Sequence, residues 1–495
     1  MIQQKTRMNR FFLWALVLAL PLAIILLNQS TQSSDPAATS PSNIADKPTP
    51  AATALAPAPE RFSSLAAIEA DPTVKRRALN IQHWQTSNGA RVYFVAAPEL
   101  PMLDLRLVFD AGSARDGEQA GLAMMTSGLI GEGTDNLSAS QISQGFEGLG
   151  VEFSAGSYRD MAIASIRSLS DPLQLQPALD LFMEVVSEPS FPADAFSRSR
   201  NQALASLQHQ QQRAGVLANL RFFSALYGDH PYAIPSQGTE ETLSRMQRSD
   251  LQGFYQRYFV ANNLVISLVG DLDRPSAERI AQQISDRLPA GQRAPELPPV
   301  KPLSTATLAH IEHSSQQTQI LVGGLGVSKG DPDYAALYVG NEILGGGGFG
   351  SRLMEEVREK RGLTYGVYSH FAPMHERGPF MISLKTRADQ SELALQVVND
   401  TLAGFLANGP TPLELKTAKQ NILGSFPQTT ASNSSIVSQL GSIGFYDLPL
   451  DQLEQFLADV EQVSAQQIRD AFARHIDQQK LITITAGQPQ TGKEG

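Results

Sequence analysis

The sequence predicts an α+β protein with two homologous repeats, each a mainly antiparallel sheet covered by helices. An N-terminal transmembrane helix is predicted to precede the two repeats. Three features favour this class: an internal repeat, helices with an apolar face, and β-branched runs that suit buried strands. At 495 residues the chain is also too long for a single hydrophobic core.

The internal repeat consists of matching segments that occur in the same order in both halves. A strand-like run lies at 105–109 and again at 319–323, and NQALASL at 201–207 matches QNILGSF at 420–426. Both halves end in a strand followed by glycine, LVISLVG and LITITAG. Because the register is kept along the whole length, the pattern indicates an internal duplication.

Side-chain periodicity predicts the elements within each half. Between residues 172 and 186 the apolar residues recur at helical spacing, namely at Leu175, Leu179, Phe182, Met183 and Val186. The β-branched runs that close the two halves favour buried strands. Each half is therefore expected to place helices over one face of a sheet.

The N-terminus carries a targeting signal. Lys5, Arg7 and Arg10 precede an uninterrupted apolar run at 11–27, which as a helix would span about 25 Å. Only Lys47 is basic between 28 and 60, so the positive-inside rule predicts a cytoplasmic tail at 1–10 and a transmembrane anchor at 11–27. The body would then lie in the periplasm, anchored in the inner membrane. Signal cleavage and secretion to the periplasm is the alternative, although the first A-x-A site lies far downstream at 52–54.

Two segments of biased composition predict the domain boundaries. Residues 28–72 are rich in Ser, Thr, Ala and Pro and cannot bury enough apolar surface to offset chain entropy, so we expect a disordered linker. Five prolines between 288 and 302 indicate an extended linker at 289–302. The two repeats are then expected at 73–288 and 303–490.

Composition excludes several classes of function. The formal net charge is −10, whereas a nucleic-acid partner requires clustered Lys and Arg. The chain has no cysteine, which excludes disulfides, thiolate metal ligands and a cysteine nucleophile.

Four stretches carry a resemblance to a known family: RLVFDAGSARDGEQAGLA, YGDHPYAIPSQGTEETL, EILGGGGFGSRLMEEVREKRGLTYGVYS and the VGD that closes the first half. Together with the repeat, they resemble the M16 (pitrilysin-like) metallopeptidases, in particular the processing-peptidase-like branch with two repeats per chain. The resemblance covers residues from about 80 to 487 and implies the M16 (LuxS/MPP-like) fold.

Active members of that family carry His-x-x-Glu-His on the first helix, where two His bind Zn²⁺ and the Glu activates the metal-bound water. In this sequence those positions are Met124, Ser127 and Gly128. The third ligand, a Glu, should fall near 204–206, but no acidic residue occurs between Asp194 and Asp229. The chain itself is therefore expected to bind no zinc and no other cofactor, and to be inactive alone.

The histidines offer one dense cluster elsewhere, HIEH at 310–313. It follows an alternating stretch that predicts a strand, in which His310 and His313 point to opposite faces. A solvated strand end is therefore favoured over a metal site there, and His230 is interpreted as a loop histidine.

The resemblance also implies a catalytic pair in the second half, because active members use an Arg and a Tyr spaced R-x6-Y. Arg358 and Tyr365 match that spacing. Their guanidinium and phenol groups could donate to a substrate carbonyl as negative charge develops on it. The alternative is that Arg358 pairs with Glu355, one turn away, and Tyr365 only packs.

The run GGGGFG begins with Gly345, Gly346, Gly347 and Gly348. It lacks the Gly-Lys-Ser/Thr of a phosphate-binding loop. Glycines would nevertheless let this loop move or approach a peptide closely, so it is predicted to bind substrate.

These observations lead to a hypothesis about function. The resemblance implies a non-catalytic subunit of a membrane-anchored M16 zinc peptidase heterodimer, which binds peptide or unfolded protein and completes the site of a zinc-bearing partner. The alternative is an M16-fold scaffold or chaperone-like binding protein with no role in proteolysis.

Overall fold

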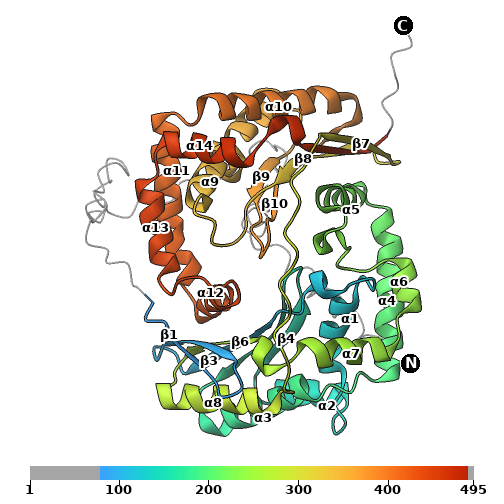
Figure 1. The fold of residues 1–495 in the computed structure, drawn as a ribbon, viewed down its shortest axis with the longest axis vertical. Coiled ribbons are helices and arrows are strands. Elements are labelled where there is room, and N and C mark those ends of the chain that lie inside the picture. Colours follow the sequence, from blue (N-terminus) through green and yellow to red (C-terminus); the bar gives the residue numbers. More distant parts are fainter. Residues whose placement is uncertain (1–78, 489–495) are drawn as a thin grey trace, which may run out of the picture. The chain divides into compact units, whose positions relative to one another are not determined.

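The computed structural model describes residues 79–488 (Figure 1). The tail, anchor and linker predicted at 1–72 lie outside these residues. Among the helices of the described part, none combines the length and the apolar character that crossing a bilayer requires.

The first half of the chain contributes a mixed sheet with the strand order β1-β2-β6-β3-β5-β4. Only β2 and β6 pair in parallel, and the other neighbours are antiparallel. Its strands are β1 (Gln82–Gln85), β2 (Arg91–Ala96), β3 (Met102–Phe109), β4 (Glu152–Ser157), β5 (Ala162–Leu169) and β6 (Leu264–Gly270).

The second half contributes a mixed sheet with the order β7-β11-β8-β10-β9, in which only β7 and β11 are parallel. Its strands are β7 (Thr307–Glu312), β8 (Gln317–Leu325), β9 (Val367–Phe371), β10 (Pro379–Arg387) and β11 (Ile482–Gly487). This order repeats that of β2-β6-β3-β5-β4, so the matching sequence segments occupy matching places in the two sheets. The predicted strand LVISLVG is β6.

One face of the first sheet is covered by helices of its own half, which bury a core that includes Phe94, Leu105 and Phe182. These helices are α1 (Leu122–Leu129), α2 (Ala139–Gly148), α3 (Pro172–Ser187), α4 (Ala193–Gln211), α6 (Glu240–Arg245), α7 (Arg248–Tyr258) and α8 (Arg274–Arg287). Helix α3 confirms the predicted helix, and all five residues of its apolar stripe are buried.

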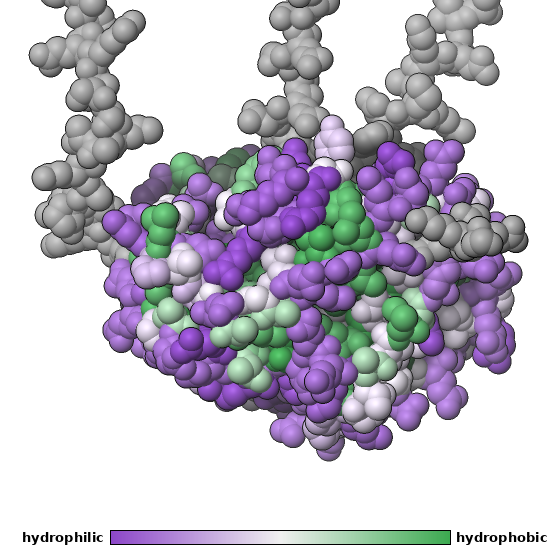
Figure 2. All heavy atoms as spheres, turned by 90° about the horizontal axis from the view of Figure 1, so that it is seen from above, coloured by the Kyte–Doolittle hydropathy of each residue, from purple (hydrophilic) through white to green (hydrophobic). Residues whose placement is uncertain are grey.

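The second sheet is covered in the same way by α9 (Tyr334–Asn341), α10 (Ser391–Asn408), α11 (Pro412–Ser425), α13 (Gln452–Gln462) and α14 (Ala465–His475). They bury a core that includes Leu337, Phe380 and Phe472. Figure 2 shows the outer surface of this half, where an apolar band lies among hydrophilic side chains.

The other face of each sheet is covered by a helix from the other half of the chain. We call this arrangement the exchange of helices between the halves. Helix α12 (Asn433–Phe445), from the second half, packs on β2, β6 and β3 of the first sheet (Figure 1). Helix α5 (Ala214–Tyr227), from the first half, packs on β7, β8 and β11 of the second sheet. Leu440 of α12 and Phe222 of α5 are fully buried in the resulting cores.

Glycines allow α12 to approach the first sheet closely. A Cβ on Gly444 would lie 2.5 Å from Cε2 of Tyr93 and 2.6 Å from Cγ1 of Val265. Both neighbours are buried, so neither side chain has room to move away. The contact therefore depends on the absence of a side chain at Gly444.

Replacing Gly444 with alanine should lower the free energy of unfolding by about 1–3 kcal/mol, because the added methyl overpacks the interface between α12 and the sheet. Gly404→Ala in α10 is the matched control, since nothing lies within 4 Å of the added Cβ. The control should be neutral or stabilising by up to about 1 kcal/mol, through helix propensity. Denaturant unfolding measures both, and equal stability of the two variants would contradict the packing described.

Candidate functional site

Helix α1 carries the three positions that correspond to the zinc motif. Met124 is partly buried and Gly128 is exposed one turn later, whereas Ser127 is 1% exposed. Its Oγ has no hydrogen-bond partner among the described residues. A thioether, a buried hydroxyl and a hydrogen supply neither the imidazoles nor the carboxylate of a zinc peptidase site.

Helix α4 packs against α1 and carries the position predicted for the third ligand. Leu204 is partly buried there, and Ala205 and Ser206 are exposed. The degenerate positions therefore lie on two helices that pack together, and none of these residues is an acid, a histidine or a cysteine. The residues present do not fit a zinc ion.

A buried carboxylate keeps the start of α1 in place. Asp116 accepts hydrogen bonds from the backbone N–H groups of Gly121, at 2.8 Å, and Ala123, at 2.7 Å. These are N–H groups that a helix cannot satisfy by itself. Burial raises the pKa of Asp116 to about 7. Packing and capping by the protein thus maintain this helix without metal ligands.

Among residues 79–488, Asp331, Asp333 and His475 are the only group close enough to share a metal ion. Arg474 already donates two hydrogen bonds to the Asp333 carboxylate, at 2.9 and 2.6 Å, and lowers its pKa. The His475 ring lies 2.9 Å from the same carboxylate. These residues therefore form an ion-pair network in which Arg474 supplies the positive charge that a metal ion would otherwise supply.

The histidine cluster predicted to lie on a strand does so. His310 is exposed on β7, and its ring bonds Oγ1 of Thr485 at 2.8 Å. His313 follows the end of the strand and accepts from the backbone N–H of Ser315.

Arg358 and Tyr365 lie close together on the surface of the second half. The guanidinium carbon of Arg358 is 5.9 Å from the Tyr365 ring centre and 4.5 Å from that of Phe349. Tyr365 is 88% exposed and Phe349 is 67% exposed, so both rings are available to a ligand. Sequence reasoning identified the first two residues and missed Phe349.

The pairing of Arg358 with Glu355 does not form. Glu355 lies 2.9 Å from Lys360, whereas the acid nearest to Arg358 is Glu359, at 3.6 Å. The segment Met354–Glu359 is a π-helical turn rather than an α-helix, so side chains three residues apart no longer stack on one face. Arg358 is consequently held by rings and by a single distant carboxylate.

One glycine of the run is buried by packing, and the next three are exposed or partly exposed at the surface. Gly345 is buried, and a Cβ there would lie 2.5 Å from Oγ of Ser369. Gly346 is exposed, and Gly347 and Gly348 are partly exposed. Gly348 has φ +61° with nothing near its Cβ position, so its backbone conformation is the reason for glycine there. Contact with a ligand is therefore open to Gly346, Gly347 and Gly348 but not to Gly345.

A carboxylate lies beside this loop. Oε1 of Glu342 is 3.0 Å from the Cβ position of Gly347, and burial raises the pKa of Glu342. The loop therefore joins an aromatic and guanidinium cluster (Phe349, Arg358 and Tyr365) to a partly buried acid.

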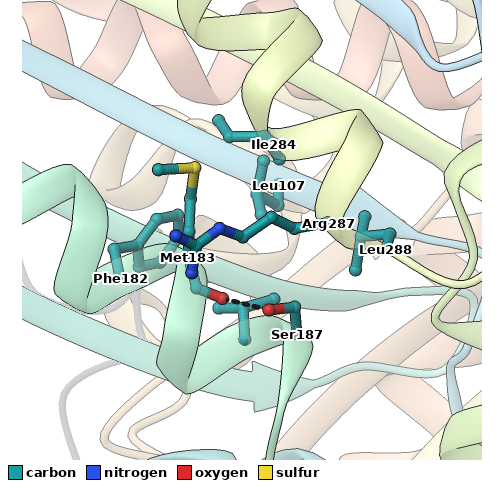
Figure 3. Close-up of a pocket in the computed structure, with 8 residues that line it drawn as sticks. Leu107, Phe182, Met183, Ser187, Ile284, Arg287 and Leu288 are labelled. Carbon is teal, nitrogen blue, oxygen red and sulfur yellow. Dashed lines mark hydrogen bonds between the residues drawn. The ribbon is translucent and has the colours of Figure 1, made fainter.

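The recess drawn in Figure 3 lies elsewhere, between β3, α3 and α8. Its volume is about 10 Å³, and its lining is largely apolar, with Leu107, Phe182 and Ile284 among its residues. The Arg287 side chain crosses its mouth, as Figure 3 shows. The recess is smaller than ordinary ligand pockets and carries no group suited to peptide chemistry.

The fold and the site together define a class: a two-sheet α+β protein that keeps the zinc-peptidase helix without its ligands. Family models match both halves, one described as insulinase (peptidase family M16) over residues 91–240 and one as peptidase M16 inactive domain over residues 245–422. The solved structure of a peptidase M16 inactive domain from Pseudomonas fluorescens is 49% identical, with a TM-score of 0.81, and the match covers 83% of this chain and 99% of that one. The chain belongs to the M16 peptidase family.

Curated relatives carry two kinds of name. A non-peptidase homolog, YmxG, of Helicobacter pylori is 27% identical over 388 residues, which is 76% of this chain and 87% of the relative. An uncharacterized zinc protease of Mycobacterium tuberculosis is 27% identical over 412 residues, which is 82% of this chain and 92% of the relative. With the ligands missing from α1, these matches support a non-catalytic M16-fold protein.

The segment that presents Arg358 is anchored by an ion pair whose effect depends on pH. Arg352 donates to Glu414 at 2.6 and 2.8 Å and to the carbonyl of Gly409 at 2.8 Å. These bonds lower the pKa of Glu414 from 4.5 to about 2. The pair therefore stabilises the fold fully above pH 4.5, and this contribution is lost as the pH falls through about 2.

We expect Arg352→Gln to lower the thermal unfolding midpoint at neutral pH, and this difference from the wild type should shrink progressively below pH 4.5. Arg245→Gln removes an arginine from a highly exposed pair with Glu241 and is the control. It should change stability little at any pH. A destabilisation by Arg352→Gln that does not vary with pH would rule out the ion pair as its cause.

Proposed function

We propose that this chain is the non-catalytic, substrate-binding and site-completing subunit of an M16 zinc peptidase heterodimer. Its body would lie in the periplasm, anchored to the inner membrane by the N-terminal segment. The observation that carries the proposal is the combination of a helix without zinc ligands and a partly exposed Arg358 beside the exposed ring of Tyr365.

The pair has the chemistry that peptide hydrolysis needs from a second subunit. A guanidinium and a phenol can both donate hydrogen bonds to a carbonyl oxygen that gains negative charge. Arg358 is held between two rings and makes no short ion pair, so its N–H groups remain available. The partner subunit is expected to carry the zinc ion.

Two open sheet edges suit an extended peptide. Strand β4 is the outer strand of the first sheet and contacts α1, and β9 is the outer strand of the second sheet and contacts the segment that begins the glycine run. An edge strand has backbone N–H and C=O groups that a peptide can pair with. Gly345 packs against Ser369 of β9, and Gly346, Gly347 and Gly348 follow it in the chain, where absent side chains permit close backbone approach.

A scaffold or chaperone-like binding protein is the alternative. The name of the Helicobacter pylori relative, a non-peptidase homolog, favours it. The exposed Arg358–Tyr365 pair favours the peptidase subunit, because a scaffold has no use for oxyanion donors. Affinity purification from the native membrane separates the two, by recovering either an M16 peptidase with an intact zinc motif or an unrelated complex.

Co-expression with an M16 peptidase that carries His-x-x-Glu-His tests the proposal directly. Peptide cleavage by the pair should fall about 100-fold with Arg358→Ala, and less with Tyr365→Phe, because each change removes a donor to the oxyanion. The fall should appear in kcat, while size-exclusion chromatography shows that the two subunits still assemble.

Arg361→Ala is the matched control, because Arg361 is a nearby arginine that bonds Glu356 and does not contact Tyr365. It should leave kcat within about twofold. Full activity of both Arg358→Ala and Tyr365→Phe in an intact pair would exclude the site-completing role.

A further inference from the structure

A row of polar side chains crosses the first sheet on the face that α12 packs against. The strand register places Arg106 of β3 opposite Ser267 of β6 on one side and Ser165 of β5 on the other. Ser165 in turn pairs with Ser154 on the edge strand β4, and their hydroxyl oxygens are 2.9 Å apart. Because directly opposed residues point to the same face, the four side chains form one row across the sheet.

The inner end of this row has unsatisfied polar atoms. Among the described residues, neither Nε of Arg106 nor Oγ of Ser267 has a hydrogen-bond partner, and both atoms are buried. A Cβ on Gly441 of α12 would lie 3.3 Å from Cδ of Arg106, so this glycine makes room for the arginine stem. The outer end, at Ser165 and Ser154, is open to solvent.

Among the described residues, Arg106 lies near the carboxylate of Asp104 but forms no direct ion pair with it. The acid two residues away, Asp104, is paired with Arg167 at 3.0 Å, and Glu152 lies opposite Arg167 in the register. On the side of Arg106 away from Asp104, the next pair of side chains on this face of the sheet is apolar, with Val108 opposite Ile163. Burial lowers the pKa of Arg106, and the charges of Tyr158 and Asp104 oppose this shift. The side chain is partly buried, and its Nε–H is a buried donor without an acceptor among the described residues, which costs stability and favours a ligand that accepts from the guanidinium.

We propose that Arg106, with the hydroxyls of Ser165 and Ser154, binds a carboxylate of the peptide ligand, either an acidic side chain or the C-terminus. This rests on the proposed function, because it takes the ligand to be a peptide. A guanidinium binds a carboxylate through two parallel N–H bonds, and hydroxyls can donate to the remaining lone pairs. The hydroxyls lead from Arg106 to the open edge at β4, which gives an extended peptide a way in.

Calorimetry of the full chain with three matched peptides tests the assignment. One peptide has a central Glu and an amidated C-terminus, one has Gln and an amidated C-terminus, and one has Gln and a free C-terminus. One of the two carboxylate peptides should bind about tenfold more tightly than the neutral peptide, and this identifies the source of the carboxylate. Arg106→Gln should abolish the preference. Arg287→Gln, in α8 on the opposite face of the sheet, should keep it.

The outcomes separate this assignment from the proposed function. Equal binding of all three peptides, or a preference that survives in Arg106→Gln, would overturn the assignment while leaving peptide binding intact. Failure of every peptide to bind would overturn both. The unfolding midpoint of Arg106→Gln should equal or exceed that of the wild type, because the buried Nε–H without an acceptor is removed. Arg106→Met is the second variant, and if neither folds, Arg106 is a structural residue and the assignment fails.

Discussion

The exchange of α5 and α12 between the two halves is the contact on which the rest of the structure depends. Each sheet has two apolar faces, and the helices of its own half cover only one of them. The second face is buried by a single helix from the other half, α12 on the first sheet and α5 on the second. Because removing apolar surface from water is the main driving force of folding, neither half can complete its core without the other.

A hydrogen-bonded carboxylate reinforces this exchange. Asp160, buried between β4 and β5 of the first half, accepts from Oη of Tyr232 at 2.5 Å and from Oη of Tyr446 at 3.0 Å. It also accepts from the backbone N–H of His375, at 2.8 Å. Tyr446 follows α12 directly, so the network fixes the end of the exchanged helix. A buried carboxylate with three donors favours one arrangement of the halves, since any shift leaves a polar group unpaired.

This arrangement positions both candidate regions through contacts of the protein itself. In the first half, α1 is held by the buried Asp116 and by packing on α4 and α7. In the second half, Arg352 and Glu414 hold the segment that presents Arg358. Neither region needs a metal for its position, so loss of the ligands leaves the architecture intact.

Short-range sequence periodicity was enough to predict helices and strands. It could not predict that α5 and α12 each pack on the sheet of the other half. Strand β6 and helix α3 follow from short-range periodicity, and Arg358 and Tyr365 follow from their spacing in a family resemblance. That α12 belongs over the first sheet depends on contacts such as Gly444 with Tyr93, far apart in the sequence, for which no local signal exists. The alternative pairing of Arg358 with Glu355 does not form, because a π-helical turn replaces the α-helix assumed from the sequence. Phe349 could not be found, since its contact with Arg358 depends on how the glycine run turns.

The central claim is that the family's architecture persists here without its metal. The most direct measurement is the zinc content of the purified full-length chain after exposure to zinc and gel filtration, taken together with cleavage of a quenched peptide library by the chain alone. We expect much less than one zinc per chain and no chelator-sensitive cleavage. One tightly held zinc per chain, with cleavage that a chelator abolishes, would contradict it.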